Sequence, residues 1–151
     1  MGGNSRLGFP ACLDDVICIG STDGKGNKSS FTPGPYPEKK YSYYSTLGEG
    51  VESSWPRHLN KDKGVERKSG TSYATPIAAG IAATILHFMH QSPNPDKYLL
   101  SRLCSKRGMQ MAIRQMIVER DGFDYIVPWE LFHKLGEADI APAIVRFLRY
   151  I

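Results

Sequence analysis

The residues best suited to chemistry lie in one stretch, Ser69 to Gly80, where a short turn delivers a serine to the start of an apolar segment. A serine hydroxyl is a poor nucleophile until a base removes its proton. At a helix start, Ser72 would lie at the positive end of the helix dipole, and its backbone N–H would point where an oxyanion could form. These residue types suit nucleophilic attack on a carbonyl carbon.

Two neighbours of Ser72 bear on this interpretation. Gly70 would let the chain turn tightly and would leave space for a substrate backbone. Pro76 lacks the N–H that would bond the carbonyl of Ser72, a feature with little use in a purely structural helix. An alternative stays open, because Gly-Thr-Ser is also a common helix cap.

The residues before the serine read as strands and loops. Val16 to Gly20 is an apolar run of β-forming residues, typical of a strand buried on both faces of a parallel sheet. Asp23 to Asn27 has the residues of a turn. Further expected elements are a short strand at 29–32, a loop at 36–44, a short strand within 48–56 and a hydrophilic loop at 58–68.

Helices follow the serine. Ile77, Ile81 and Ile85 recur every four residues beside small alanines, which predicts a buried helix from Tyr73 to about His90. The composition changes near Pro93, and we expect one domain with a first part at 1–92 and a helical C-terminal extension at 93–151. Within that extension the sequence predicts helices at 96–106, 109–119, 129–134 and 138–150, a joint at 107–108, a turn at 121–122 and an extended segment at 123–127.

Composition excludes several classes of protein. The length of 151 residues suits one globular domain, and 41% of the residues are hydrophobic and 23% charged. The net charge of +4 is mild and spread out, so we expect no nucleic-acid partner. The uncharged stretch at 69–95 lacks a sustained run of about 20 apolar residues, so we expect no membrane helix.

The cysteines and the first residues of the chain bear on the cellular location of the protein. Cys12, Cys18 and Cys104 are irregularly spaced, which indicates reduced thiols and no metal site. No apolar signal-peptide core precedes Pro10. We therefore predict an intracellular, cytoplasmic protein.

The longer pattern Gly-Thr-Ser-x-Ala-x-Pro at residues 70–76 resembles the serine motif of the subtilisin-like serine proteases, or subtilases. The resemblance extends over about Phe9 to Phe88, through Phe9-Pro10-Ala11, the strand at 16–20, Ser21-Thr22-Asp23, Ser30-Phe31 and the segment at 50–56. It implies an α/β fold: a fragment of a subtilisin-like fold, with parallel strands and a buried serine helix, followed by a helical C-terminal region.

The resemblance also implies roles for individual residues. Ser72 would be the nucleophile of a serine endopeptidase, with its backbone N–H as one oxyanion donor, and Gly70, Thr71, Ala74 and Pro76 would complete the motif. Peptide bonds would be hydrolysed through an acyl-enzyme. Some members of the family bind a weak structural cation where this chain has the carbonyls of Ala11, Leu13 and Val16, and no other cofactor is expected.

The base for Ser72 is not found in this sequence. Subtilases place an Asp and then a His upstream of the Ser, and His58 is the only histidine before Ser72 and matches no family motif. His87 and His90 would lie roughly 22 and 27 Å along the helix, and His133 lies in the unmatched region.

The oxyanion Asn of the family would also fall just before Met1, and we do not expect Asn4 to replace it. The sequence thus predicts the C-terminal half of a catalytic domain, with a peptide or protein substrate and little activity without the N-terminal half that carries the Asp and His. The alternative is an inactive subtilase remnant that serves as a binding or structural module.

Overall fold

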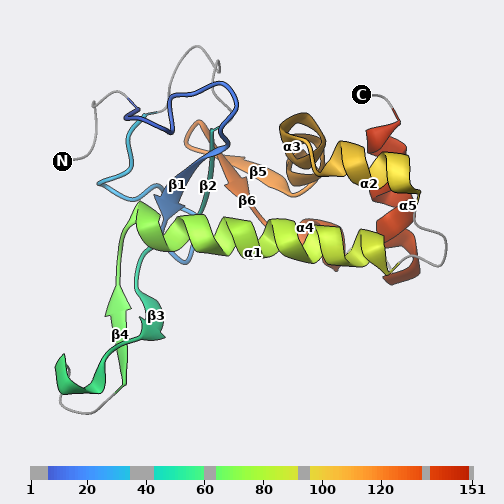
Figure 1. Cartoon of the computed structure of the whole chain (residues 1–151). Helices are drawn as coiled ribbons and strands as arrows, with labels where there is room; N and C mark the ends of the chain where they lie inside the picture. The colour runs from blue at the N-terminus through green and yellow to red at the C-terminus, as the bar shows by residue number, and fades with distance from the viewer. Residues whose placement is uncertain (1–6, 35–42, 60–63, 92–95, 134–136, 150–151) are drawn as a thin grey trace.

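The computed structural model describes residues 7–34, 43–59, 64–91, 96–133 and 137–149, and it consists of a small sheet crossed by one long helix (Figure 1). Helix α1 lies across the sheet, and α2, α3 and α5 gather near the far end of α1 (Figure 1). The elements are β1 Cys18–Thr22, β2 Tyr43–Leu47, β3 Val51–Ser54, η1 Arg57–Leu59, β4 Val65–Lys68, α1 Thr71–His90, α2 Lys97–Leu103, α3 Lys106–Arg114, β5 Ile117–Arg120, β6 Phe123–Ile126, α4 Trp129–Phe132 and α5 Glu137–Leu148.

The main sheet has the strand order β1-β2-β6-β5, and its first three strands are parallel. Its register pairs Cys18 with Tyr43 and Thr22 with Leu47. The predicted mixed α/β class with a mostly parallel sheet is confirmed. The predicted strand at 16–20 is present as β1, shifted by two residues toward the C-terminus.

Strand β2 was not predicted, because its residues were expected within or just after the loop at 36–44. The predicted loop at 36–44 lies largely outside the described residues, but Tyr43 and Tyr44 open β2. The sequence Tyr-Tyr-Ser-Thr-Leu is too polar to predict a central strand, yet Tyr44, Ser45 and Thr46 are at most 3% exposed. The Ser45 hydroxyl donates to the carbonyl of Asp124, which partly offsets the cost of burial.

Helix α1 confirms the predicted helix, but the predicted burial holds for one face only. Ala74, Ala78, Ile85 and Met89 are buried, and small residues there let the helix approach the sheet closely. By length and composition α1 could also cross a membrane, with a mean hydropathy of 1.2, but the core helix of a soluble protein passes the same test. One face of α1 packs on β1 and β2, although only 22% of its most apolar 18-residue window is buried.

Strands β3 and β4 form an antiparallel hairpin that projects from the sheet (Figure 1). The predicted strand within 48–56 is present as β3, whereas the loop predicted at 58–68 is wrong in its last part, which is β4. The strand predicted at 29–32 is also wrong, because only Lys28 bridges to Thr22 and the following residues turn back on β1 through side-chain bonds.

The joint between the first two C-terminal helices differs from the prediction. The joint falls at Cys104–Ser105 and not at 107–108, because the Ser105 hydroxyl caps α3 by accepting from the N–H of Gly108 at 3.1 Å. Gly108 lies inside α3, packed against the backbone of α2, where a Cβ would approach the carbonyl carbon of Arg102 within 2.7 Å.

The helix predicted at 109–119 ends early, at Arg114. The β-branched Ile117 and Val118 open β5 instead, and the turn predicted at Asp121–Gly122 joins β5 to β6. Both turn residues have positive φ, 51° and 78°, as the tight hairpins with Asp-Gly require. The region after Pro93 is therefore helical with two strands, and those strands complete the sheet of the first part.

The location of Cys18 gives a direct test of β1. Burial raises the pKa of the Cys18 thiol from 9.0 to about 11, whereas Cys104 is exposed. The thiolate is the reactive form of a cysteine. A pKa two units higher lowers the thiolate fraction of Cys18 about 100-fold near pH 8. We expect iodoacetamide at pH 8 to alkylate Cys104 much faster than Cys18, as mapped by peptide mass spectrometry. Similar rates in the folded protein, and not only in denaturant, would contradict the buried strand.

Candidate functional site

Ser72 lies in the first turn of α1, as its second residue, and its side chain is exposed. The helix begins at Thr71, and the N-cap residue is Gly70, which makes no side-chain cap. The hydroxyl of Ser72 therefore does not cap the helix, which argues against the capping alternative. In the part of the chain that the structure describes, no histidine or carboxylate bonds to this hydroxyl.

Two successive backbone hydrogen bonds hold the serine turn against the sheet. At the end of β1 the carbonyl of Thr22 accepts from the N–H of Gly48 at 2.9 Å, and the carbonyl of Gly48 accepts from the N–H of Gly70 at 2.8 Å. The Ser69 hydroxyl accepts from the N–H of Gly50 at 3.0 Å and closes the same turn. The start of α1 is thus fixed at the carboxyl ends of β1 and β2, the edge where open α/β sheets bind ligands.

Gly48, which the sequence did not single out, is the glycine that this packing needs. A Cβ there would meet the Ser21 hydroxyl and approach the Gly70 carbonyl oxygen within 2.9 Å. Gly70 itself has an extended backbone with φ of 161°, and a Cβ there would make only ordinary contacts, the nearest at 3.6 Å. The tight-turn reason expected for Gly70 is therefore wrong. The Gly48-Glu49-Gly50 spacing was the available sequence signal.

The first turn of α1 presents free backbone donors beside the hydroxyl. The N–H groups of Tyr73 and Ala74 donate to the Gly70 carbonyl, whereas no acceptor among the described residues faces the N–H of Thr71 or Ser72. Pro76 lies inside α1 and supplies no N–H to the Ser72 carbonyl. Free N–H groups at the positive end of a 20-residue helix are a suitable environment for an oxyanion.

A buried polar cluster supports the end of β1. The hydroxyls of Ser21 and Ser29 lie 2.8 Å apart, and Thr32 Oγ1 accepts from the N–H of Ser21 at 2.9 Å and donates to its carbonyl at 3.0 Å. All three side chains are at most 1% exposed. Beyond the strand, Asp23 accepts from the side chain and backbone of Asn27 and from the N–H of Lys25, which lowers the pKa of its carboxyl.

The sequence placed three histidines away from Ser72, and the structure agrees for His58, His87 and His90. His58 is exposed in η1, at the outer end of the hairpin. Strand β4 runs from that end toward the serine turn, and its four residues span about 13 Å at 3.3 Å per residue. His87 and His90 are exposed in the last turn of α1, and His133 is exposed after α4. The structure thus brings no described histidine to the serine turn.

The described residues contain no group of three or more histidine, cysteine, aspartate and glutamate side chains that could hold a metal. The weak cation suggested for the carbonyls of Ala11, Leu13 and Val16 remains a prediction. In the structure the carbonyl of Leu13 accepts from the N–H of Val16 at 3.1 Å.

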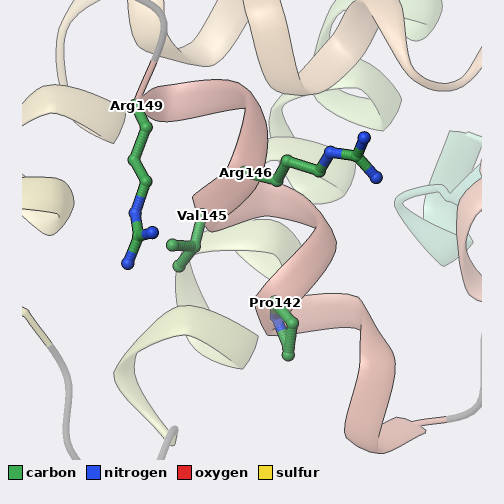
Figure 2. Close-up of a pocket in the computed structure, with 4 residues that line it drawn as sticks. All are labelled: Pro142, Val145, Arg146 and Arg149. Atoms are coloured by element: carbon green, nitrogen blue, oxygen red, sulfur yellow. The ribbon is translucent and has the colours of Figure 1, made fainter.

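A hollow of about 440 Å³ lies along α5, lined by Pro142, Val145, Arg146 and Arg149. Figure 2 shows the two arginine side chains extending in different directions from the helix. Because the guanidinium groups do not converge, this hollow is not a built anion site, and it is no part of the serine site.

Comparison with known proteins assigns this chain to a family. The sequence model of the subtilase family, Peptidase_S8, matches residues 1–123. The chain belongs to the subtilase family. Subtilisin-like protease PopC of Myxococcus xanthus is 34% identical over 82 residues, which cover 54% of this chain and 17% of PopC. Thermitase of Thermoactinomyces vulgaris is 32% identical over 83 residues, which cover 55% of this chain and 26% of Thermitase.

Solved structures of subtilase protease domains share the fold. The protease domain of PatA superposes with a TM-score of 0.57 at 21% identity, over 94% of this chain and 43% of the other. A lanthipeptide protease superposes with a TM-score of 0.62 at 16% identity, over 84% of this chain and 44% of the other. The chain thus spans less than half of these structures and about a quarter or less of the curated relatives named above.

Gly48 gives a test of how the serine turn is held. We expect Gly48→Ala to lower the free energy of unfolding by about 1–3 kcal/mol, because the added methyl overlaps Ser21 and Gly70. The matched control is Gly80→Ala on α1, where a Cβ meets nothing within 4 Å and should stabilise the helix by about 0.5–1 kcal/mol. Urea unfolding followed by circular dichroism measures both, and a neutral Gly48→Ala would refute this packing.

Proposed function

We propose that Ser72 is the nucleophile of a serine endopeptidase whose remaining catalytic groups lie outside these 151 residues. The observation that carries the proposal is the hydroxyl of Ser72, exposed in the first turn of α1, used by no cap and set beside free backbone N–H groups. Membership of the subtilase family supports it, and the family implies peptide substrates.

The proposed chemistry is acyl transfer. Ser72 Oγ attacks the carbonyl carbon of the scissile peptide bond while a base takes the hydroxyl proton. The backbone N–H of Ser72 stabilises the oxyanion of the tetrahedral intermediate. The C–N bond then breaks as the base returns the proton to the leaving nitrogen, and water hydrolyses the acyl ester and restores the hydroxyl.

The chain is proposed to be the serine-bearing, C-terminal half of the catalytic domain, with the triad Asp and His and the oxyanion Asn supplied by a preceding segment. This proposal is supported by the described residues, among which no histidine or carboxylate bonds to Ser72. An intracellular location and the weak cation site are further proposals that rest on the sequence alone.

A second candidate is an inactive subtilase remnant that acts as a binding or structural module. The same lack of a base near Ser72 favours it. The two candidates differ in one property, because only the first requires the Ser72 hydroxyl to become reactive once the preceding segment is present.

The coding sequence upstream of Met1 distinguishes the two candidates at little cost. We expect the reading frame to continue upstream with an Asn for the oxyanion and, before it, motifs that contain the His and the Asp. In-frame stop codons directly upstream would contradict the proposal that the preceding segment belongs to the same polypeptide.

Labelling by a fluorophosphonate tests the nucleophile. We expect the chain with its preceding segment to be labelled on Ser72, and Ser72→Ala to abolish labelling, because the probe reacts only with an activated serine. Ser101→Ala, at an exposed serine of α2, is the matched control and should be labelled normally. The isolated chain should label weakly or not at all. Unchanged labelling of Ser72→Ala, measured by peptide mass spectrometry, would rule out this nucleophile.

A further inference from the structure

The net positive charge of the chain is concentrated in one short region. Residues 96–114 contain five of the 19 lysines and arginines but only one of the 15 acidic residues. The charge of +4 looks spread out along the sequence, but the cations outside this region are matched in number by carboxylates. Helices α2 and α3 therefore carry the whole excess of positive charge. An excess of this kind repels itself and attracts anions.

The cations of α2 and α3 have no carboxylate partner among the described residues. The ion pairs found in that part of the chain both lie in the β3–β4 hairpin. Asp96, the one acidic residue of the region, uses its Oδ1 to accept from the N–H groups of Tyr98 and Leu99 and so caps α2. The positive charge of both helices is therefore available to an external anion.

Four of these cations form what we call the basic surface, which consists of Lys97, Arg102, Lys106 and Arg107. Helices α2 and α3 pack against each other where Gly108 lies next to the backbone of Arg102 and leaves no room for a Cβ. The Ser105 hydroxyl donates to the Arg102 carbonyl at 2.6 Å and caps α3, which fixes the joint. Lys106 and Arg107 follow this joint directly. The cations of the two helices are thus held near one corner.

Arg102 is oriented before any partner binds. Its Cζ lies 5.4 Å from the centroid of the Tyr98 ring, and its Nη1 donates to the Tyr98 hydroxyl at 3.3 Å. Tyr98 is itself 67% exposed, so this pair stands at the surface. The remaining N–H groups of the guanidinium fork suit carboxylate oxygens, and a side chain that is already held loses less entropy on binding.

The placement of the cations on α3 does not favour folding. Lys106 and Arg107 are the first two residues of this helix, at the positive end of its dipole. Cations are unfavourable there, and carboxylates are favourable. The charge of the basic surface is therefore not explained by the stability of α3, and a bound anion would relieve the repulsion.

We propose that the basic surface docks an acidic peptide segment, whose carboxylates pair with the cations of α2 and α3. Helix α3 is nine residues long, about 14 Å, which matches roughly four residues of an extended peptide. The surface lies toward the far end of α1 from Ser72 (Figure 1). Docking there goes beyond the proposed function and does not depend on the reactivity of Ser72. In a peptide cut at Ser72, it would hold a segment remote from the scissile bond.

Two features of the basic surface favour a peptide over other polyanions. A membrane surface takes up apolar side chains beside the cations, but the leucines of α2 and Ala112 and Ile113 of α3 are buried. Single-stranded nucleic acid stacks its bases on exposed aromatic rings. Tyr98 is the only aromatic residue of the two helices, and Arg102 lies over its ring. What remains is recognition of charge over a short length, which suits a peptide with several carboxylates.

The test measures fluorescence anisotropy of a fluorescein-labelled peptide of alternating glutamate and serine, titrated with the purified chain. We expect the same peptide with glutamine in place of glutamate to bind at least about tenfold more weakly, and the affinity to fall as salt is added. Arg107→Glu and Lys97→Glu, both at exposed positions, should each weaken binding about tenfold, because repulsion replaces attraction. Arg57→Glu, at an exposed arginine of η1, is the control with an equal change of charge and should bind normally.

Unfolding in urea separates lost docking from lost structure. Arg107→Glu places a carboxylate in the first turn of α3, so its urea midpoint should not fall while its binding weakens. Equal effects of Arg107→Glu and Arg57→Glu, or a lowered midpoint in both Arg107→Glu and Lys97→Glu, would overturn the proposal. Equal affinity for the glutamine peptide, or tighter binding of oligothymidine or of phosphatidylserine vesicles than of the acidic peptide, would overturn it as well. Fluorophosphonate labelling of Ser72 is measured separately, so failure of the proposed function would leave the docking result unchanged.

Discussion

The site depends on the hydrogen bonds that link Thr22, Gly48 and Gly70. They join the ends of β1 and β2 to the residue before α1, so that the first turn of the helix cannot move independently of the sheet. Gly48 makes the link possible, since any side chain there would press against Ser21 and the Gly70 carbonyl. The exposure of the Ser72 hydroxyl and of its neighbouring N–H groups follows from this link, because the start of α1 is held at a sheet edge and not capped by its own side chains.

The same link explains how the proposed nucleophile can be held in place although no described residue supplies a base for it. The orientation of the helix arises from the backbone bonds of Thr22, Gly48 and Gly70, from the bond between Gly50 and the Ser69 hydroxyl, and from the packing of α1 on the sheet. The proton acceptor is a separate requirement, which no described residue meets.

The sequence predicted the parts whose signals are local. The four-residue recurrence of isoleucine predicted α1, the β-forming run predicted β1, and Asp121-Gly122 predicted a turn. It failed where tertiary contacts override local preference: the polar Tyr-Tyr-Ser-Thr of β2 is buried because neighbouring strands bond its backbone, and Ile117 enters β5 because β6 offers a partner. The catalytic role of Ser72 stays a prediction from its motif, whereas Gly48 was missed because its role is a contact across three segments.

Hydrogen exchange at the Gly70 amide tests the central claim, that the sheet fixes the serine turn in this chain before any partner binds. The Gly70 N–H donates to the Gly48 carbonyl at 2.8 Å, one residue before a helix whose next N–H groups are free. We predict that this amide exchanges as slowly as the β1–β2 amides in the isolated chain, while those of Thr71 and Ser72 exchange rapidly. Rapid exchange at all three positions would show that the turn is not held by the sheet, and the account would fail.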